Sequence, residues 1–111
     1  MQFMPTKIAA SSSLGAAVDL RYGAVVGFYF DAWTTAAMTL QASRDNVNWF
    51  NVLNYDGTEW QVQPAASSFV NLSPLELQGA RFIRPRSGTA AAAVNQVADA
   101  NITIATREVE G

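Results

Sequence analysis

The three tryptophans, Trp33, Trp49 and Trp60, are the residues of this chain best suited to binding another molecule. An indole ring stacks well on the face of a sugar, and it also anchors protein interfaces. A small β-protein more often uses its tryptophans as core residues, and we favour that role over a protein interface and over a glycan contact. We expect Trp60 to be the exposed one, because it follows a predicted turn and lies between Glu59 and Gln61.

Arg81, Arg84 and Arg86 form the one basic cluster of the sequence. On an extended strand Arg84 and Arg86 share a face and Arg81 points to the other. Two interpretations stay open: a solvated edge that discourages strand pairing, or guanidinium groups that bind carboxylates of a neighbouring subunit. Three arginines in a chain of net charge −2 are too few for phosphate contacts, so we expect no nucleic-acid partner.

Four carboxylates, Asp45, Asp56, Glu59 and Asp99, are candidate calcium ligands, since calcium needs several converging oxygens. Their spacing matches no calcium loop, and Asp45 and Asp56 stand at predicted turns, so we expect neither a metal nor another cofactor. The chain has no histidine and no cysteine, which removes the usual general base, thiolate nucleophile and zinc ligands. Paired carboxylates could still support glycoside hydrolysis, but no pair stands out, and we predict a protein that is not an enzyme.

The 111 residues that position these side chains suit one domain and are too few for two. Half of them are hydrophobic, only 14% are charged and one is a lysine, whereas globular domains carry about a quarter charged residues. We infer a chain that works packed against partners. No apolar run approaches the roughly 18 residues of a membrane span, and the first residues lack a signal-peptide pattern, so we expect no membrane contact and synthesis in the cytoplasm.

Short apolar runs, interrupted by turn residues, predict an all-β fold, a single-domain antiparallel β-sandwich or barrel. An N-terminal arm or first edge strand is expected within residues 1–12, followed by the sandwich over 13–111. The strands are expected at 16–21, 24–31, 36–43, 48–54, 58–62, 67–72, 80–87 and 101–109.

Residues 24–31 are apolar on both faces, which predicts a central strand covered on both sides. Gly27 within it indicates a bulge or a close backbone approach. Pro85 is expected to push the strand at 80–87 towards an edge or a bulge, because proline cannot donate to the ladder.

The stretch 36–63 predicts a three-stranded meander with turns at 44–46 and at Asp56-Gly57, the latter of type I′. Within it Met38, Leu40 and Ala42 alternate with Thr39, Gln41 and Ser43, which predicts one buried face. Residues 73–77 predict one helical turn, with a serine cap and a glutamate three residues later. For 88–100 a short helix and an ordered loop both stay open, and we favour the loop.

Several segments resemble a group of small tailed-phage and prophage proteins encoded among virion structural genes. They are AVDL at 17–20, AWTTA at 32–36, LQAS at 40–43, GARFI at 79–83, RSGT at 86–89 and VNQ at 94–96. The resemblance spans nearly the whole chain and implies a component of the phage particle. We expect a capsid decoration (cement) protein on the particle surface, because such proteins are small, β-rich, often trimeric and without catalytic residues.

The implied partners are the phage major capsid protein and further copies of this chain in a homotrimer. Phe3 and Met4 would contact the shell from an N-terminal arm that orders on binding. The other candidate contacts are Trp60, Arg84, Arg86, Val94 and Gln96.

A second resemblance covers mainly the second half of the chain. The segments SRDNVNW at 43–49, ARFIR at 80–84 and 102–111 are similar to discoidin-type (coagulation factor 5/8 C) jelly rolls. Asn46 replaces the usual glycine, and the paired terminal cysteines are absent. This similarity implies that the predicted β-sandwich is a jelly roll. It also implies an alternative function as a glycan-binding module, with Trp60 as the sugar contact. A structural role in the neck or tail of the particle is a further alternative.

Overall fold

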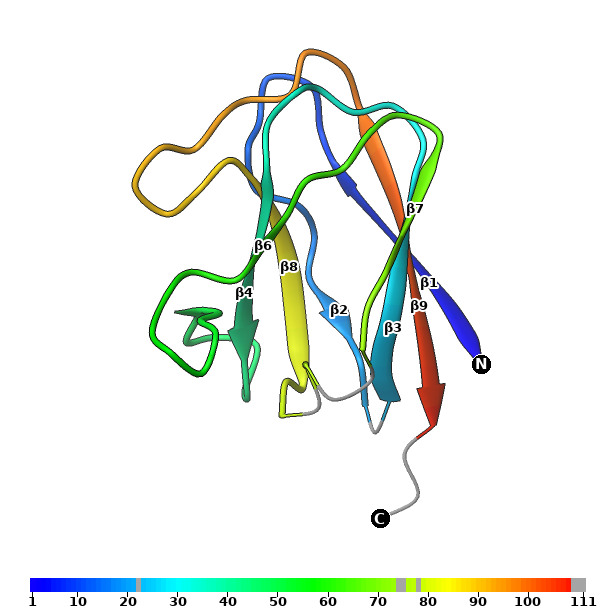
Figure 1. Ribbon diagram of the computed structural model, residues 1–111, viewed down its shortest axis with the longest axis vertical. Helices are drawn as coiled ribbons and strands as arrows, with labels where there is room; N and C mark the ends of the chain where they lie inside the picture. Colours follow the sequence, from blue (N-terminus) through cyan, green and yellow to red (C-terminus); the bar gives the residue numbers. More distant parts are fainter. Residues whose placement is uncertain (22, 74–75, 78, 109–111) are drawn as a thin grey trace.

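The computed structural model describes residues 1–21, 23–73, 76–77 and 79–108 as two antiparallel β-sheets packed face to face (Figure 1). No helix occurs in these described ranges. One sheet, called sheet A, contains in spatial order β1 (Gln2–Ile8), β9 (Ala100–Glu108), β3 (Gly23–Phe30) and β7 (Ser68–Asn71). The other, sheet B, contains β2 (Val18–Asp19), β8 (Phe82–Ser87), β4 (Met38–Ser43) and β5 (Phe50–Asn51), with β6 (Gln61–Val62) also paired to β4. The predicted all-β sandwich is therefore confirmed.

The connectivity is that of a jelly roll. The short strands β5 and β6 pair with successive stretches of β4, at 41–42 and 38–39, and so share one strand position. From β4 to β6 the chain stays in sheet B, and at every other step it passes from one sheet to the other, as it does in double-sheet jelly rolls. The predicted meander is wrong in its last strand, because β6 returns to β4 instead of extending the sheet beyond β5.

The core lies between the sheets and is built by alternate residues of each strand. In β4 Met38 and Leu40 are fully buried between the sheets, and Thr39 and Gln41 lie on the opposite face, as the alternation predicts. That face is not open to solvent throughout, because Thr39 is also fully buried and accepts a hydrogen bond from Arg86. Phe28 of β3 packs against Trp60, with ring centroids 6.2 Å apart. The buried cluster comprises Ile8, Val18, Leu20, Val25, Phe28, Phe30, Met38, Leu40, Trp60, Leu72, Leu77, Ile83, Ala100, Ile102 and Ile104.

Strand β3 is central in sheet A, between β9 and β7, as predicted. Its register against β9 shifts between Val25 and Gly27, which confirms the bulge. Gly27 also lies so close to the ring of Phe69 that a side chain there would overlap it, which confirms the close approach. The predicted cover on both faces fails at Tyr29, which points into solvent with 46% of its surface exposed, whereas Ala24 and Gly27 are buried.

Pro85 does not push β8 to an edge, since β8 lies between β2 and β4. The Pro85 carbonyl accepts a hydrogen bond from Gly15 N–H at 2.8 Å, on the side away from β4. In an antiparallel strand the N–H and C=O of one residue point the same way, so the missing N–H also points away from β4. The two-residue strand β2 pairs only with Phe82 and Ile83, so no residue of β2 lies opposite Pro85. The hydrogen-bond ladder between β8 and β4 therefore loses no bond.

Both predicted turns are present, although one has a different geometry. Gly57 N–H donates to the Asn54 carbonyl, which makes Tyr55 and Asp56 the central residues. Gly57 has a φ of 90° and Asp56 has no positive φ, so the predicted type I′ turn at Asp56-Gly57 is wrong. In the turn at 44–46 Asn46 adopts a φ of 61°, as its tolerance of left-handed geometry predicts.

The remaining segments complete the frame. Residues 88–100 form an ordered loop, as predicted, with a bridge between Gly88 and Ala93. Of the two alternatives for the N-terminus the structure has the edge strand, because β1 pairs with β9 along its whole length. The predicted helical turn at 73–77 includes residues 74 and 75, which lie outside the described residues, and it stays a prediction.

Candidate interaction site

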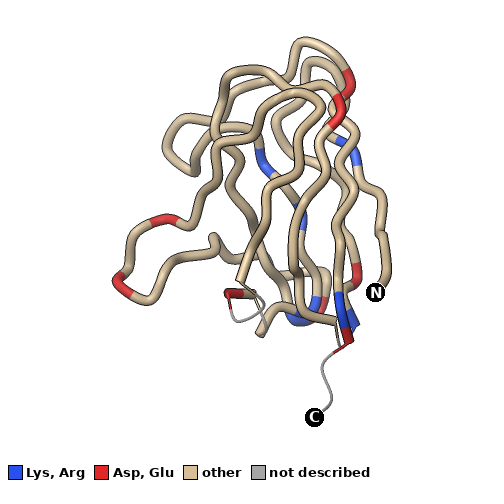
Figure 2. Tube along the Cα trace, turned by 45° about the vertical axis from the view of Figure 1, so that its right-hand side comes forward, with Lys and Arg blue, Asp and Glu red and all other residues tan. Residues whose placement is uncertain are grey.

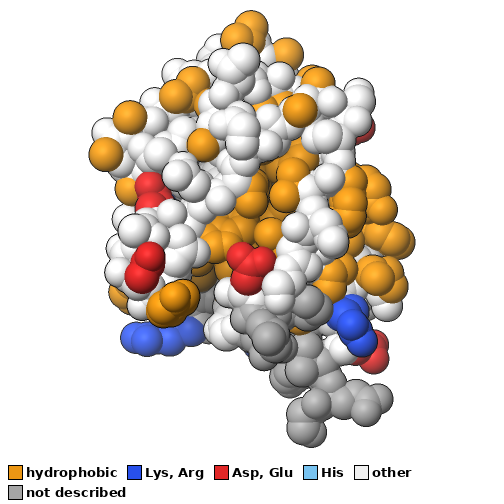
Figure 3. All heavy atoms as spheres, in the orientation of Figure 1, with side chains coloured by type: hydrophobic (Ala, Val, Ile, Leu, Met, Phe, Trp, Pro, Cys, Tyr) orange, Lys and Arg blue, Asp and Glu red, His pale blue; other side chains and the backbone are white. Residues whose placement is uncertain are grey.

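Three aromatic side chains, Phe3, Tyr29 and Phe69, form a row across the outer face of sheet A, here called the aromatic row. The rings of Phe3 and Tyr29 meet edge to face with centroids 6.2 Å apart, and those of Tyr29 and Phe69 lie 4.4 Å apart. Each side chain remains 44–59% exposed. In Figure 3 hydrophobic side chains gather on the right-hand side, over the strands of sheet A. A contiguous exposed aromatic surface of this kind is typical of interaction sites.

Strand register explains why the three rings line up. Phe3 of β1 is paired with Ala105 of β9, and Ala105 is paired with Gly27 of β3. Tyr29 lies two residues along from Gly27 on the same face and is paired with Phe69 of β7. Gly27, which has no side chain, leaves the space into which the Phe69 ring leans. The result is a low, uncharged aromatic surface that spans all four strands.

Trp60 is not exposed, contrary to the prediction. It retains 4% of its surface, its ring packs on Phe28, and its Nε1–H donates to Glu76 Oε1 at 3.3 Å. The Trp60 N–H donates to the Val52 carbonyl, which draws the hairpin back onto the end of the sandwich and turns the indole inward. Trp60 therefore offers no free ring face to a sugar, and the glycan-binding alternative loses the residue on which it rested.

Arg86 is buried on the outer face of sheet B, which it shares with Arg84 as predicted. Its guanidinium donates to Thr39 Oγ1 at 3.0 Å, to Asn51 Oδ1 at 3.0 Å and to Glu59 Oε2 at 2.7 Å. These three acceptors belong to the same chain. Of the two open interpretations the solvated edge is wrong for Arg86, because β8 is a central strand and Arg86 is buried. Pairing of Arg86 with a neighbouring subunit stays a prediction.

Arg84 is also held within the chain. Its guanidinium lies 4.2 Å from the centre of the Trp49 ring, and its Nε donates to Gln41 Oε1 at 2.8 Å. Burial and the nearby positive charge of Arg86 lower the pKa of Arg84. Arg81 points elsewhere and donates two hydrogen bonds to the Asp19 carboxylate, which hold the Asp19 pKa below its usual range.

The other predicted contacts divide between the surface and the interior. Gln96 is buried, and its side chain donates to Thr34 Oγ1 at 3.1 Å and Ser87 Oγ at 2.8 Å, which ties the 88–100 loop to two other segments. Met4 packs against the core, whereas Phe3 and Val94 are exposed. Phe3 and Val94 are therefore the members of the predicted contact set that present a substantial apolar surface to a partner.

The carboxylates that were weighed as calcium ligands have separate structural tasks. Asp45 accepts hydrogen bonds from the Val47 and Asn48 N–H groups, which hold its pKa well below its usual range. Asp99 accepts from Ala10 N–H and pairs with Lys7 at 3.6 Å. Among the described residues no three His, Cys, Asp or Glu side chains converge as metal ligands. Figure 2 shows the few charged residues spaced along the trace, with long uncharged stretches between them.

The described part of the chain also has no helix long and apolar enough to cross a membrane. Comparisons of the chain with protein-family models, with curated proteins and with solved structures find no match. The class of protein is thus defined by its architecture alone, an antiparallel jelly-roll sandwich. Fold does not determine function in such sandwiches, so the exposed surfaces carry the functional argument.

Sequence reasoning missed Tyr29 and Phe69 as surface residues. The signal was present, because residues 24–31 are apolar on both faces and 111 residues are too few to build a third layer over the sheet. The apolar pattern alone indicated two apolar faces. Only together with the chain length does it indicate that one of them stays uncovered.

Proposed function

We propose that this protein is a non-enzymatic structural component of a phage particle that binds the outer surface of the capsid shell through the aromatic row. The observation that carries this proposal is the exposed row itself, which runs across every strand of sheet A. An uncharged aromatic face favours a partner surface that is also apolar, and aromatic residues are enriched at the centres of protein interfaces.

The composition supports an interface role. Only 14% of the residues are charged and one is a lysine, the residue that interfaces most disfavour. The assignment to a phage particle rests on a sequence resemblance to small tailed-phage proteins. The segments that carry it include 17–20, 32–36, 79–83 and 86–89. A binding role that needs no reacting groups also fits a chain without histidine or cysteine.

The energetics favour several linked copies over one. Burying the exposed parts of three rings removes on the order of 300 Å² from water, roughly 7 kcal/mol, which is comparable to the cost of association. One copy would therefore bind the shell weakly. A trimer that engages three equivalent sites gains in avidity without new contacts, which is why the proposal includes a trimer. Val94 and Val97 of the 88–100 loop are exposed as a second apolar surface for these contacts.

The first test is the number of copies of this chain per copy of the major shell protein, measured by quantitative peptide counting on purified particles. We expect a ratio near one or a fixed large fraction of it. A handful of copies would instead assign the chain to the neck or tail, and the absence of the chain from particles would overturn the proposal.

The second test addresses the surface. Tyr29→Ser in the aromatic row should lower the occupancy of particles by at least tenfold, because it removes the central ring of the row. Phe50→Ser is the matched control, since Phe50 is an aromatic residue of similar exposure on β5 in sheet B. Equal occupancy by the two variants, with both folded, would show that the aromatic row is not the shell contact.

A further inference from the structure

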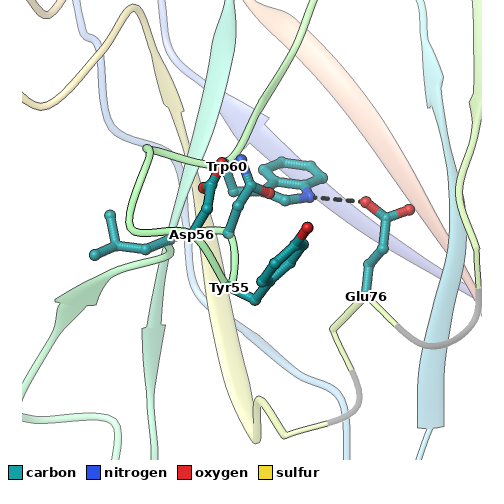
Figure 4. Close-up of a pocket in the computed structure, with 6 residues that line it drawn as sticks. Tyr55, Asp56, Trp60 and Glu76 are labelled. Atoms are coloured by element: carbon teal, nitrogen blue, oxygen red, sulfur yellow. Dashed lines mark hydrogen bonds between the residues drawn. The ribbon is translucent and has the colours of Figure 1, made fainter.

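A pocket of about 470 Å³ opens beside the hairpin that joins β5 and β6, on a different part of the molecule from the aromatic row. Its size lies within the range of small-ligand sites. Figure 4 shows Tyr55 with its hydroxyl directed towards the space between Trp60 and Glu76, and Asp56 beside it. The pocket is lined by Leu53, Asn54, Tyr55, Asp56, Trp60 and Glu76.

The pocket carries two negative charges. Asp56 Oδ1 accepts hydrogen bonds from the N–H and hydroxyl of Thr58, which hold the Asp56 pKa below its usual range and keep the carboxylate charged at neutral pH. Glu76 accepts from Trp60 Nε1–H and from Ser73 N–H. Among the described residues no Lys or Arg nitrogen lies within 4.0 Å of either carboxylate. Asp56 Oδ2 has no hydrogen-bond partner in the described part of the chain.

Two aromatic rings accompany these charges. Trp60 forms the inner wall, and its indole is fixed by the hydrogen bond to Glu76 and by packing on Phe28. Tyr55 is fully exposed at the mouth of the pocket. An aromatic face next to a carboxylate attracts cations, because the ring quadrupole and the negative charge act in the same direction.

The chain itself shows what such a combination binds. Arg84 lies over the Trp49 ring, and Arg81 lies 5.2 Å from the centre of the Phe82 ring while it pairs with a carboxylate. In both cases a guanidinium rests on an aromatic face and donates to an oxygen acceptor. The pocket between Tyr55 and Glu76 supplies the same ring and acceptor without a cation.

We propose that this pocket binds a guanidinium group, the end of an arginine side chain presented by a partner protein. A planar guanidinium can stack on the Tyr55 ring while its N–H groups donate to the Asp56 and Glu76 carboxylates. A rounded alkylammonium, such as tetramethylammonium, has no N–H to donate and would use the exposed Tyr55 ring alone. The inference is independent of the proposed shell contact, because it uses none of the residues of the aromatic row.

The test is a titration of the full chain with N-acetyl-L-arginine amide, followed by the NMR signal of the Trp60 indole N–H. That proton lies in the pocket wall and donates to Glu76, so it responds directly to occupancy. The uncharged isostere N-acetyl-L-citrulline amide and tetramethylammonium are titrated in parallel. We expect saturable shifts with the arginine probe, at least tenfold weaker binding of the other two, and weakening with added salt.

Asp56→Asn should weaken the arginine probe by at least threefold, because it removes one charge and keeps the Oδ1 acceptor that Thr58 needs. Asp31→Asn is the matched control, since Asp31 is an exposed carboxylate that does not line the pocket. The affinity of the Asp31→Asn variant for the arginine probe should stay unchanged. Equal binding of arginine and citrulline probes, equal binding of tetramethylammonium, or the same effect from both variants would overturn the proposal.

Discussion

The Nη2 atom of Arg86 lies 2.7 Å from Oε2 of Glu59, and only 9% and 22% of the two side chains are exposed. Glu59 also accepts a hydrogen bond from Ala90 N–H at 3.0 Å. The pair thereby joins the central strand β8 to the β5–β6 hairpin and to the 88–100 loop. It joins three segments that are distant in the sequence, on a face where the other two nitrogens of the Arg86 guanidinium donate to Thr39 and Asn51.

Glu59→Gln should lower the free energy of unfolding by about 2–4 kcal/mol, because it leaves the Arg86 charge buried without its counter-ion. The measurement is urea unfolding followed by tryptophan fluorescence. Asp19→Asn, which breaks the exposed pair with Arg81, is the control and should have a much smaller effect. Equal losses of unfolding free energy in the two variants would mean that the Arg86–Glu59 pair is solvated and does not stabilise the fold.

Trp60→Ala should destabilise the protein by about 3–5 kcal/mol, the usual cost of deleting a large buried aromatic side chain. Trp49→Ala should cost about 1 kcal/mol, because Trp49 is only partly buried and its main contact is the stacked Arg84. Thermal unfolding of the two variants measures the difference. A Trp60→Ala variant as stable as Trp49→Ala would contradict the burial of Trp60.

Much of the fold follows from local patterns that the sequence displays. The alternation of Met38 and Leu40 with Thr39 and Gln41 predicted which residues of β4 face the core, and Gly27 marked the bulge in β3. Strand pairing was less accessible, since it depends on partners far along the chain. Pro85 is the example. The central strand β8 tolerates it because its neighbour β2 pairs only with Phe82 and Ile83, and nothing near Pro85 in the sequence shows that β2 is so short.

The candidate sites were harder to predict for a related reason. Trp60 and Arg86 look like surface residues when only their polar neighbours are considered. In the fold Trp60 packs against Phe28 of β3, and Arg86 pairs with Glu59 of the β5–β6 hairpin. Both contacts join residues that are far apart in the sequence. Phe3 was correctly expected at the surface, but its ring partners Tyr29 and Phe69 come together only through the register of four strands.

Stability should stay level from neutral pH down to about pH 5 and fall steeply below about pH 4. Hydrogen bonds and nearby positive charges lower the pKa of Asp19, Asp45, Asp56 and Asp99 below the ordinary value of 3.8. A carboxylate with a lowered folded pKa contributes stability above its unfolded pKa and loses it as the pH falls towards the folded pKa. The chain has no histidine, the side chain that ordinarily titrates between about pH 5 and pH 8.

The urea midpoint measured at a series of pH values checks this expectation. Asp45→Asn should flatten the acid limb, because the pKa of Asp45 is shifted furthest below its usual range. A midpoint that already declines between pH 7 and pH 5, or an Asp45→Asn profile identical to that of the parent, would contradict the assignment to these aspartates.

Gly27→Ala tests the packing beneath the aromatic row. A β-carbon at position 27 would overlap the Phe69 ring and would lie 2.8 Å from the Val70 carbonyl oxygen, so β7 or the ring has to move. We expect a loss of about 1–3 kcal/mol in the free energy of unfolding, as for other overpacked sites. Gly79→Ala is the matched control, because a β-carbon at Gly79 meets no atom within 4 Å and should change stability little.

Phe69→Ala in the Gly27→Ala background separates the two contacts. Removing the ring relieves its overlap and leaves the contact with the Val70 carbonyl, so the double variant should be less destabilised than the sum of the single variants. The same comparison bears on the surface, because a displaced Phe69 ring no longer lies against Tyr29. Additive losses in the double variant would mean that Phe69 does not lean over Gly27, and the geometry of the aromatic row would then need revision.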